Sequence, residues 1–250
     1  MKKTSITDPL QIAFVTAAPE FGRAGITLCP GKKDKHAATG EWDRDLALDL
    51  DAIRDWGAVA VVTLLEPEEL ERLEVQNLGE EVLRRGMQWF HLPIADGATP
   101  ASRFEETWAS AGERLRSLLR SGFDVLVHCR GGLGRAGTIA ARLLVELGVE
   151  PATAVARVRS VRPGAIETSA QEAFVMNIRL DRETPKKCAE GATAPFMDWF
   201  EKLTGFREVT YNDTRSELKV EDRKLRSLIE LHWRQVLACH VTMIRRDAGT

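Results

Sequence analysis

A cysteine, three glycines and an arginine stand close together near the middle of this sequence. Cys129 is followed by Arg-Gly-Gly-Leu-Gly and then by Arg135. The residues before the cysteine are apolar and those after the arginine have helical periodicity, which predicts a strand, a glycine-rich loop and a helix. The backbone can turn at Gly131, Gly132 and Gly134, so that successive N–H groups converge on one point. Such a loop at a helix N-terminus binds a tetrahedral anion, here beside a thiol.

The chemistry that suits this segment is phosphoryl transfer to the Cys129 thiolate. The N–H groups of the loop and the helix N-terminus create a positive potential that stabilises a thiolate, the nucleophilic form of the side chain. The planar guanidinium of Arg135 can hold two phosphoryl oxygens and bind them more tightly in the transition state. We therefore expect Cys129 to be the nucleophile and Arg135 to be a catalytic phosphate ligand. The residues expected to bind the phosphate group around them are Arg130, Gly131, Gly132, Leu133 and Gly134.

A phosphocysteine pathway also needs a group that protonates the leaving oxygen and later activates water. Asp96 lies in a loop rich in glycine and proline (93–100) that follows a predicted strand. A mobile carboxylate there can reach the phosphate loop, and we assign both roles to it. The alternative is that Asp96, next to a glycine, caps a local turn. His128, which precedes the nucleophile, is expected to form a hydrogen bond behind the loop and to tune the thiolate.

Two further residues have competing interpretations. Arg162 either supports the phosphate loop from behind or forms a surface ion pair. Cys29 is either a resolving thiol for an oxidised Cys129 or an ordinary turn residue. The four cysteines form no CxxC pair and have no histidine at metal-ligand spacing, so we expect neither a metal site nor a disulfide scaffold.

The composition is that of an ordinary folded protein. Of the 250 residues 44% are apolar and 29% are charged, and 35 Lys and Arg against 37 Asp and Glu give a net charge of −2. This balance creates no field that would attract nucleic acid or an anionic membrane, so neither is an expected partner. No apolar run approaches the roughly 20 residues of a membrane span, and the first residues do not resemble a signal peptide. We expect a cytoplasmic enzyme that uses no cofactor.

The elements that must position these residues alternate between strand and helix. Strands are predicted at 11–15, 58–65, 87–92 and 123–128, and helices at 43–56, 67–85, 102–121, 135–147, 151–161 and 169–182. This alternation predicts a three-layer α/β/α domain in which helices flank a mainly parallel central sheet.

A change in composition divides the chain near residue 190. The domain with the candidate site is predicted to span 1–185, and the segment 186–195, with its proline and glycine, is typical of a linker. Residues 196–250 contain helical patterns and are expected to form a small helical C-terminal appendage of unknown role, because about fifty residues make a poor core alone.

Three segments, in the expected order, resemble the superfamily of protein tyrosine and dual-specificity phosphatases. The pattern His-Cys-x5-Arg at 128–135 is similar to its signature, and particularly to that of the cyclin-dependent-kinase-associated phosphatases. The segment 93–100 resembles the acid loop of that group, and 162–168 resembles the segment after its signature helix. The resemblance covers about residues 10–182. It implies the cysteine-phosphatase fold, with Cys129 as nucleophile, Arg135 as phosphate ligand and Asp96 as general acid.

The sequence departs from this family directly after the signature arginine. Family members usually carry Ser or Thr there, whose hydroxyl assists breakdown of the phosphoenzyme, whereas this sequence has Ala136. Turnover is therefore expected to be slow unless Thr138 supplies the hydroxyl. In some relatives a glutamine positions the hydrolytic water, and this resemblance implies that role for Gln171. On the sequence alone, Gln171 is equally expected to be an exposed helix residue.

The predicted function is hydrolysis of phosphoserine, phosphothreonine or phosphotyrosine on a phosphoprotein, for which the resemblance suggests a kinase. Three other classes stay open: a pseudophosphatase that binds without turnover, a phosphatase of a non-protein phosphomonoester, and a sulfurtransferase. The spacing of the cysteine and the arginine favours phosphate over sulfur chemistry. Arg130 is the one basic residue inside the loop, which disfavours highly charged inositol phosphates. The oligomeric state is left open.

Overall fold

A sheet of five strands forms the centre of the structure. The computed structural model describes residues 2–37 and 40–178. The strands lie in the order β1-β2-β7-β5-β6, and each neighbouring pair is parallel except β1 with β2. The carboxyl ends of four strands therefore share one edge of the sheet, where loops can meet. The strands are β1 Ala13–Val15, β2 Ala24–Thr27, β5 Ala58–Thr63, β6 Gln88–His91 and β7 Asp124–His128.

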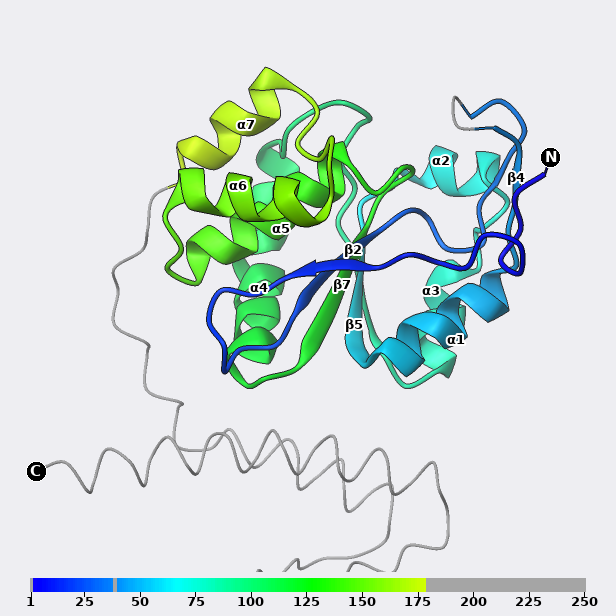
Figure 1. Cartoon of the computed structure of the whole chain (residues 1–250), viewed down its shortest axis with the longest axis horizontal. Coiled ribbons are helices and arrows are strands. Elements are labelled where there is room, and N and C mark those ends of the chain that lie inside the picture. Colours follow the sequence, from blue (N-terminus) through cyan, green and yellow to red (C-terminus); the bar gives the residue numbers. More distant parts are fainter. Residues whose placement is uncertain (1, 38–39, 179–250) are drawn as a thin grey trace, which may run out of the picture. The chain divides into compact units, whose positions relative to one another are not determined.

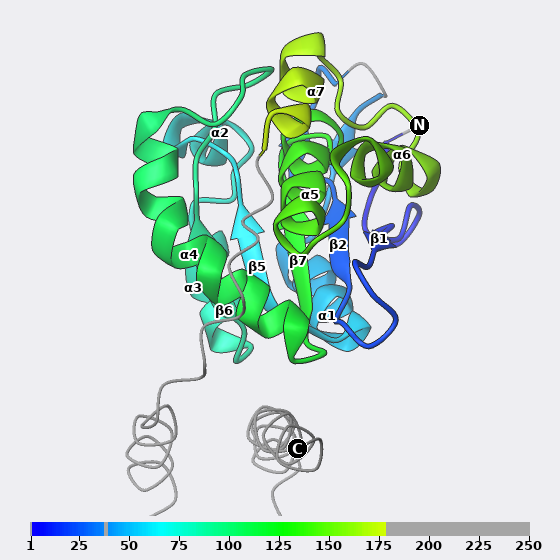
Figure 2. The ribbon, with the colours of Figure 1, turned by 90° about the vertical axis from the view of Figure 1, so that its left-hand side faces the viewer.

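Helices cover both faces of this sheet (Figure 1). In this view α1, α2 and α3 lie on one side and α4 to α7 on the other, and Figure 2 shows α4 and α5 in front of the strands. This arrangement confirms the predicted three-layer α/β/α domain with a mainly parallel sheet. The helices are α1 Leu46–Trp56, α2 Pro67–Arg72, α3 Leu78–Arg84, α4 Ser102–Arg120, α5 Gly134–Glu146, α6 Pro151–Val161 and α7 Ser169–Met176.

The core lies where the sheet meets α5 on one face and α1 on the other. Every residue of β5 is buried, as its continuous run of alanine and valine predicts for a strand covered on both faces. Every residue of α5 from Gly134 to Val145 is buried as well. The helix that follows the glycine-rich loop is therefore fixed against the sheet.

The structure differs from the prediction in the segment 67–85, which holds two helices rather than one. α2 ends because Glu74 takes a left-handed conformation, with a φ of 57°. The N–H of Val75 then donates to the carbonyl of Leu70 at 2.9 Å, a bond that closes a helix and turns the chain. α2 and α3 are therefore separate helices, and the first turn of α2 follows the carboxyl end of β5.

Three short strands were not predicted from the sequence. β2 is a four-residue strand, and β3 (Lys33–Asp34) and β4 (Trp42–Asp43) form a separate antiparallel pair. None of these segments is long enough to show a strand periodicity. The missed strand β2 is nevertheless the neighbour of β7, which carries the candidate site.

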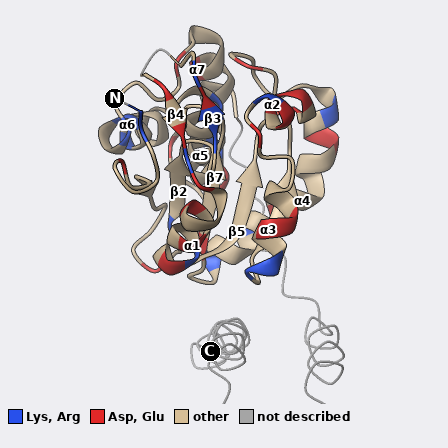
Figure 3. Cartoon of the chain, turned by 90° about the vertical axis from the view of Figure 1, so that its right-hand side faces the viewer, with Lys and Arg blue, Asp and Glu red and all other residues tan. Residues whose placement is uncertain are grey.

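The linker predicted at 186–195 and the C-terminal segment 196–250 lie outside the described residues, so the boundary near residue 185 stays a prediction. In the described part of the chain, none of the helices combines the length and the hydropathy that a membrane span requires. Residues of both charge signs occur in helices and strands alike (Figure 3).

Candidate active site

The glycine-rich loop leaves the middle of the sheet and leads directly into α5. β7, which precedes the loop, lies between β2 and β5, and so the loop stands at the carboxyl edge of the parallel strands. Cys129 is 4% exposed, and α5 begins five residues later at Gly134. The first N–H groups of α5 have no carbonyl partner within the helix and lie at the end of the loop. The predicted strand, loop and helix are all present.

Two of the loop glycines are required by the atoms around them. Gly132 has a φ of 68°, and a Cβ there would lie 2.6 Å from the backbone nitrogen of Leu28. A Cβ on Gly134 would meet the carboxylate of Glu167 and, at 3.0 Å, the amide of Gln171. The loop therefore packs closely on the chain after β2 and on the segment that begins α7.

Arg135 is buried, and its guanidinium is held by two carboxylates. Nη1 and Nη2 donate to the two oxygens of Glu69 at 2.6 and 2.8 Å. Nη1 also donates to the carbonyl of Ile94 at 2.9 Å, and Nη2 lies 2.9 Å from Oδ1 of Asp96. Burial acts to lower the pKa of Arg135, but the hydrogen-bonded Glu69 raises it above its usual value. The guanidinium is thus fixed in one plane and stays charged.

Glu69 is a site residue that was not predicted from the sequence. It lies in the first turn of α2, where its carboxylate also accepts the N–H of Glu66 at 3.0 Å. Burial acts to raise the pKa of Glu69, but the hydrogen bonds from Arg135 and from Glu66 lower it below its usual value. The one available signal was the glutamate three residues after a helix start, which is typical of a capping box. Nothing in that pattern points to Arg135, 66 residues away.

The acid loop brings Asp96 to the phosphate loop, as predicted for a general acid. The Asp96 side chain is 68% exposed, while the Arg135 side chain it contacts is 2% exposed. Its carboxylate therefore faces both the buried guanidinium and the solvent. A carboxyl group at such a boundary can exchange protons with a leaving group and with water.

His128 lies directly behind the loop in a hydrogen-bonded group. Trp89 Nε1 donates to the hydroxyl of Thr63 at 2.9 Å, and that hydroxyl lies 2.8 Å from His128 Nε2. Burial lowers the pKa of His128 to about 3, so the ring is neutral. Nδ1 on the other side of the ring has no hydrogen-bond partner among the described residues. His128 is therefore a neutral, buried residue that lies behind the loop next to Cys129.

Two arginines tie the loop to the rest of the domain. Arg162 donates from Nε to the Gly132 carbonyl at 3.0 Å and from Nη2 to the Gly131 carbonyl at 3.2 Å. These contacts with the loop backbone favour support of the loop over a surface ion pair as the role of Arg162. Arg130, predicted to bind substrate, directs its Nε and Nη2 to one oxygen of Asp34 at 3.1 and 2.9 Å. Its side chain connects the loop to β3 in this structure.

Gln171 has no exposed surface, so the expectation of an exposed helix residue was wrong. Its Nε2 donates to the carbonyl of Ala98 in the acid loop at 3.2 Å, and its Oε1 accepts the N–H of Glu167 at 3.0 Å. The capping box that starts α7 holds this side chain inward. Gln171 thus connects the acid loop with the segment beside the phosphate loop.

Thr138 is also buried and donates its hydroxyl hydrogen to the Gly134 carbonyl at 2.8 Å, within α5.

Cys29 is a buried residue at the start of a turn, where its carbonyl accepts the N–H of Lys32 at 3.4 Å. It belongs to the apolar cluster that includes Leu50, Ile53 and Val61. Burial raises the pKa of its thiol, which is therefore neutral. In this position Cys29 acts as a small apolar side chain.

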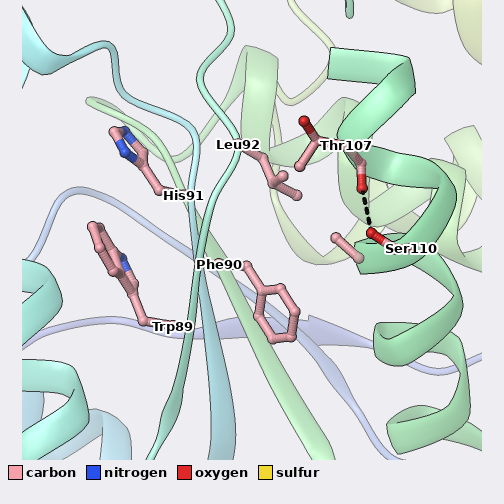
Figure 4. A pocket seen from close by; sticks show the side chains of 7 residues that line it. Trp89, Phe90, His91, Leu92, Thr107 and Ser110 are labelled. Carbon is pink, nitrogen blue, oxygen red and sulfur yellow. Dashed lines mark hydrogen bonds between the residues drawn. The ribbon is translucent and has the colours of Figure 1, made fainter. Parts of the chain in front are cut away.

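A surface cavity of about 320 Å³ lies away from the loop, between the edge strand β6 and α4 (Figure 4). Phe90 and Leu92 point toward α4, while Trp89 and His91 lie on the other side of the strand. The cavity is lined by Trp89, Phe90, His91, Leu92, Thr107, Ser110 and Ala111. None of the predicted site residues is among them, so this cavity is not the candidate active site.

The fold and the loop geometry define a phosphatase of the protein tyrosine and dual-specificity class. A family model described as Swiss Army Knife protein, DSP-PTPase phosphatase domain, matches residues 44–175. The chain therefore belongs to the dual-specificity (DSP) branch of the protein tyrosine phosphatases and is a phosphatase enzyme.

Individual relatives agree with this assignment. The chain is 31% identical over 176 residues to cyclin-dependent kinase inhibitor 3 of Rattus norvegicus, a match that covers 68% of this chain and 79% of the relative. It is 30% identical over 123 residues to human protein tyrosine phosphatase type IVA 3, covering 49% and 66% of the two chains. A solved structure of kinase associated phosphatase, with serine in place of its catalytic-site cysteine, aligns with a TM-score of 0.59 and 28% identity. That alignment covers 67% of this chain and 92% of the other.

Proposed function

We propose that this chain hydrolyses phosphoserine, phosphothreonine and phosphotyrosine on proteins through a phosphocysteine intermediate. The observation that carries the proposal is the position of Arg135, which contacts both the buried Glu69 and the acid-loop Asp96 at the start of α5. A fixed guanidinium, a glycine loop led by Cys129 and a solvent-exposed carboxylate are the three parts that this chemistry requires.

In the first step, the Cys129 thiolate attacks the phosphorus atom in line with the leaving oxygen. A sulfur–phosphorus bond forms as the phosphorus–oxygen bond breaks, and protonated Asp96 gives its proton to the leaving oxygen. The loop N–H groups and Arg135 bind the other three oxygens. The phosphoryl group takes over Arg135 donors that Asp96 contacts in this structure, which frees the carboxyl group for proton transfer.

In the second step, Asp96 accepts a proton from water, which attacks the phosphocysteine and releases inorganic phosphate and the thiolate. Gln171 contacts the acid loop through Ala98, and this supports a role in positioning the water or the loop. Ala136, at the position of the family's usual hydroxyl residue, is buried and has no group that can assist the release. The hydroxyl of Thr138 already bonds within the helix. Breakdown of the phosphoenzyme is therefore proposed to be the slow step.

The proposed substrate is a phosphoprotein, and a kinase is the specific candidate because relatives carry the names cyclin-dependent kinase inhibitor 3 and kinase associated phosphatase. We propose a cytoplasmic site of action and a catalytic domain that spans 1–185, joined by the linker 186–195 to the segment 196–250.

Hydrolysis of a generic aryl phosphate, measured with a chelator present, tests this function. The wild type should hydrolyse the aryl phosphate, and Cys129→Ser should be inactive. The kcat of Asp96→Ala should be lower than that of the wild type by roughly 10²-fold or more. An inactive wild type that still binds vanadate or a phosphopeptide would instead identify a binding module without turnover. Activity on small phosphomonoesters with none on phosphopeptides would indicate a non-protein substrate.

A further inference from the structure

A carboxylate accepts a hydrogen bond from one of the first N–H groups of α5. Oε2 of Glu167 accepts the N–H of Gly134 at 2.8 Å. Gly134 is the last residue of the phosphate loop before Arg135, so this N–H belongs to the set that the loop offers to an anion. The contact places a negative side chain beside the position of the phosphoryl group.

The chain before α7 holds Glu167 in this position. Its own N–H donates to Oε1 of Gln171, and the preceding Ile166 has a left-handed φ of 59°. Arg159 donates to the carbonyl of Ile166 at 3.0 Å, which supports this unusual backbone. The position of the Glu167 carboxylate is thus built by several bonds on both sides of the residue.

Glu167 differs from the other carboxylates near the loop because, in the described part of the chain, it forms no ion pair. Glu69 is paired with Arg135, Asp34 with Arg130 and Glu172 with Arg159. Within the described residues, the carboxylate of Glu167 belongs to no ion pair, and the residue is exposed. A bound phosphoryl dianion would therefore meet an uncompensated negative charge at close range, and like charges this close repel.

A cation brought by the substrate would remove this conflict. We propose that Glu167 selects phosphopeptides that carry a basic side chain next to the phosphorylated residue and disfavours those with an acidic neighbour. The ammonium or guanidinium of the substrate pairs with Glu167, draws its carboxylate from the Gly134 N–H, and leaves that N–H to a phosphoryl oxygen. This selection rests on the proposed phosphatase function, because it acts at the same loop.

The test compares two phosphopeptides that differ only in a lysine or a glutamate beside the phosphorylated residue. Wild type should favour the lysine peptide in kcat/KM by about tenfold. Glu167→Gln keeps an oxygen for the Gly134 N–H but removes the charge, so it should lose most of this preference and bind vanadate several-fold more tightly. Glu106→Gln, which removes an exposed carboxylate on α4, is the matched control and should behave as wild type.

Glu167→Ala separates charge from structure. If Glu167 only holds the loop in place, Glu167→Ala should have a lower melting temperature, and Glu167→Gln should keep the peptide preference of the wild type. That result would overturn the proposal. If wild type hydrolyses neither peptide but binds both, the proposed function fails. The selection between peptides is then measured from the affinities for the two peptides and for vanadate. Equal affinities in wild type and Glu167→Gln would refute the proposed selection.

Discussion

Arg135 and Glu69 form a two-point ion pair beneath the phosphate loop, with both guanidinium end nitrogens on the two carboxylate oxygens at 2.6 and 2.8 Å. The pair fixes the plane of the guanidinium before substrate arrives. An arginine held in this way loses little freedom when it binds phosphate, which favours the transition state.

Glu69→Gln should therefore impair both activity and folding. One neutral acceptor replaces a carboxylate, so Arg135 is left partly unpaired in a buried position. We expect kcat/KM to fall by at least about tenfold and the free energy of unfolding by up to about 3–5 kcal/mol. Glu68→Gln, at the exposed neighbouring position of α2, is the control. A Glu69→Gln protein with normal kcat/KM would show that the pair does not position Arg135.

Ala136→Ser should accelerate the second step. The added hydroxyl stands at the position where relatives assist breakdown of the phosphoenzyme, and Ala136 itself is buried beside the loop. We expect kcat to rise several-fold and the burst of leaving group in rapid-quench kinetics to shrink. An unchanged kcat with an unchanged burst would mean that release of phosphate does not depend on this position.

Acid should destabilise the fold through His128. Burial lowers the pKa of this histidine to about 3, below the unfolded value of about 6.5. The unfolded chain therefore binds more protons between these values, so the histidine's contribution to stability is complete above about pH 6.5 and is lost as the pH falls toward 3. Urea unfolding of wild type and His128→Asn at pH 7 and pH 5 measures this. The wild type should lose more stability over this interval than the variant, whereas equal losses would contradict a neutral buried ring.

Gly132→Ala should destabilise the protein, while Gly131→Ala should have little effect on stability. Gly132 has a left-handed φ and no room for a Cβ, whereas a Cβ on Gly131 meets no atom within 4 Å. We expect a loss of about 1–3 kcal/mol or more for the first and of less than about 0.5 kcal/mol for the second. Thermal unfolding of the two variants is the measurement. Similar melting temperatures would mean that the loop adjusts to a side chain at Gly132.

The sequence predicted the parts of the site that lie next to one another in the chain. The strand ending at His128, the loop from Cys129 and the helix with Arg135 follow from apolar runs, glycines and helical spacing, and each is present. Asp96 could be proposed because the chemistry requires an acid and a loop of the right composition was available. The three-layer architecture followed from the alternation of elements.

The residues that support the site could not be predicted in the same way. Glu69 and Asp34 meet their arginines only after the parallel strands have brought distant loops together, at separations of 66 and 96 residues. Gln171 is buried because a capping box and the acid loop surround it, although its helix has a weakly amphipathic sequence. Such contacts depend on tertiary packing, which the local periodicity of the sequence does not reveal.

Transfer of a phosphoryl group to Cys129 is tested by trapping the phosphocysteine intermediate. The enzyme is mixed with an aryl phosphate, quenched in acid within milliseconds and digested, and the peptides are analysed by mass spectrometry. We expect one phosphoryl group on the peptide that contains Cys129. The amount should be larger in wild type than in Ala136→Ser, and Cys129→Ser should carry none. A phosphoryl group on another residue, or hydrolysis that persists in Cys129→Ser, would show that Cys129 is not the nucleophile.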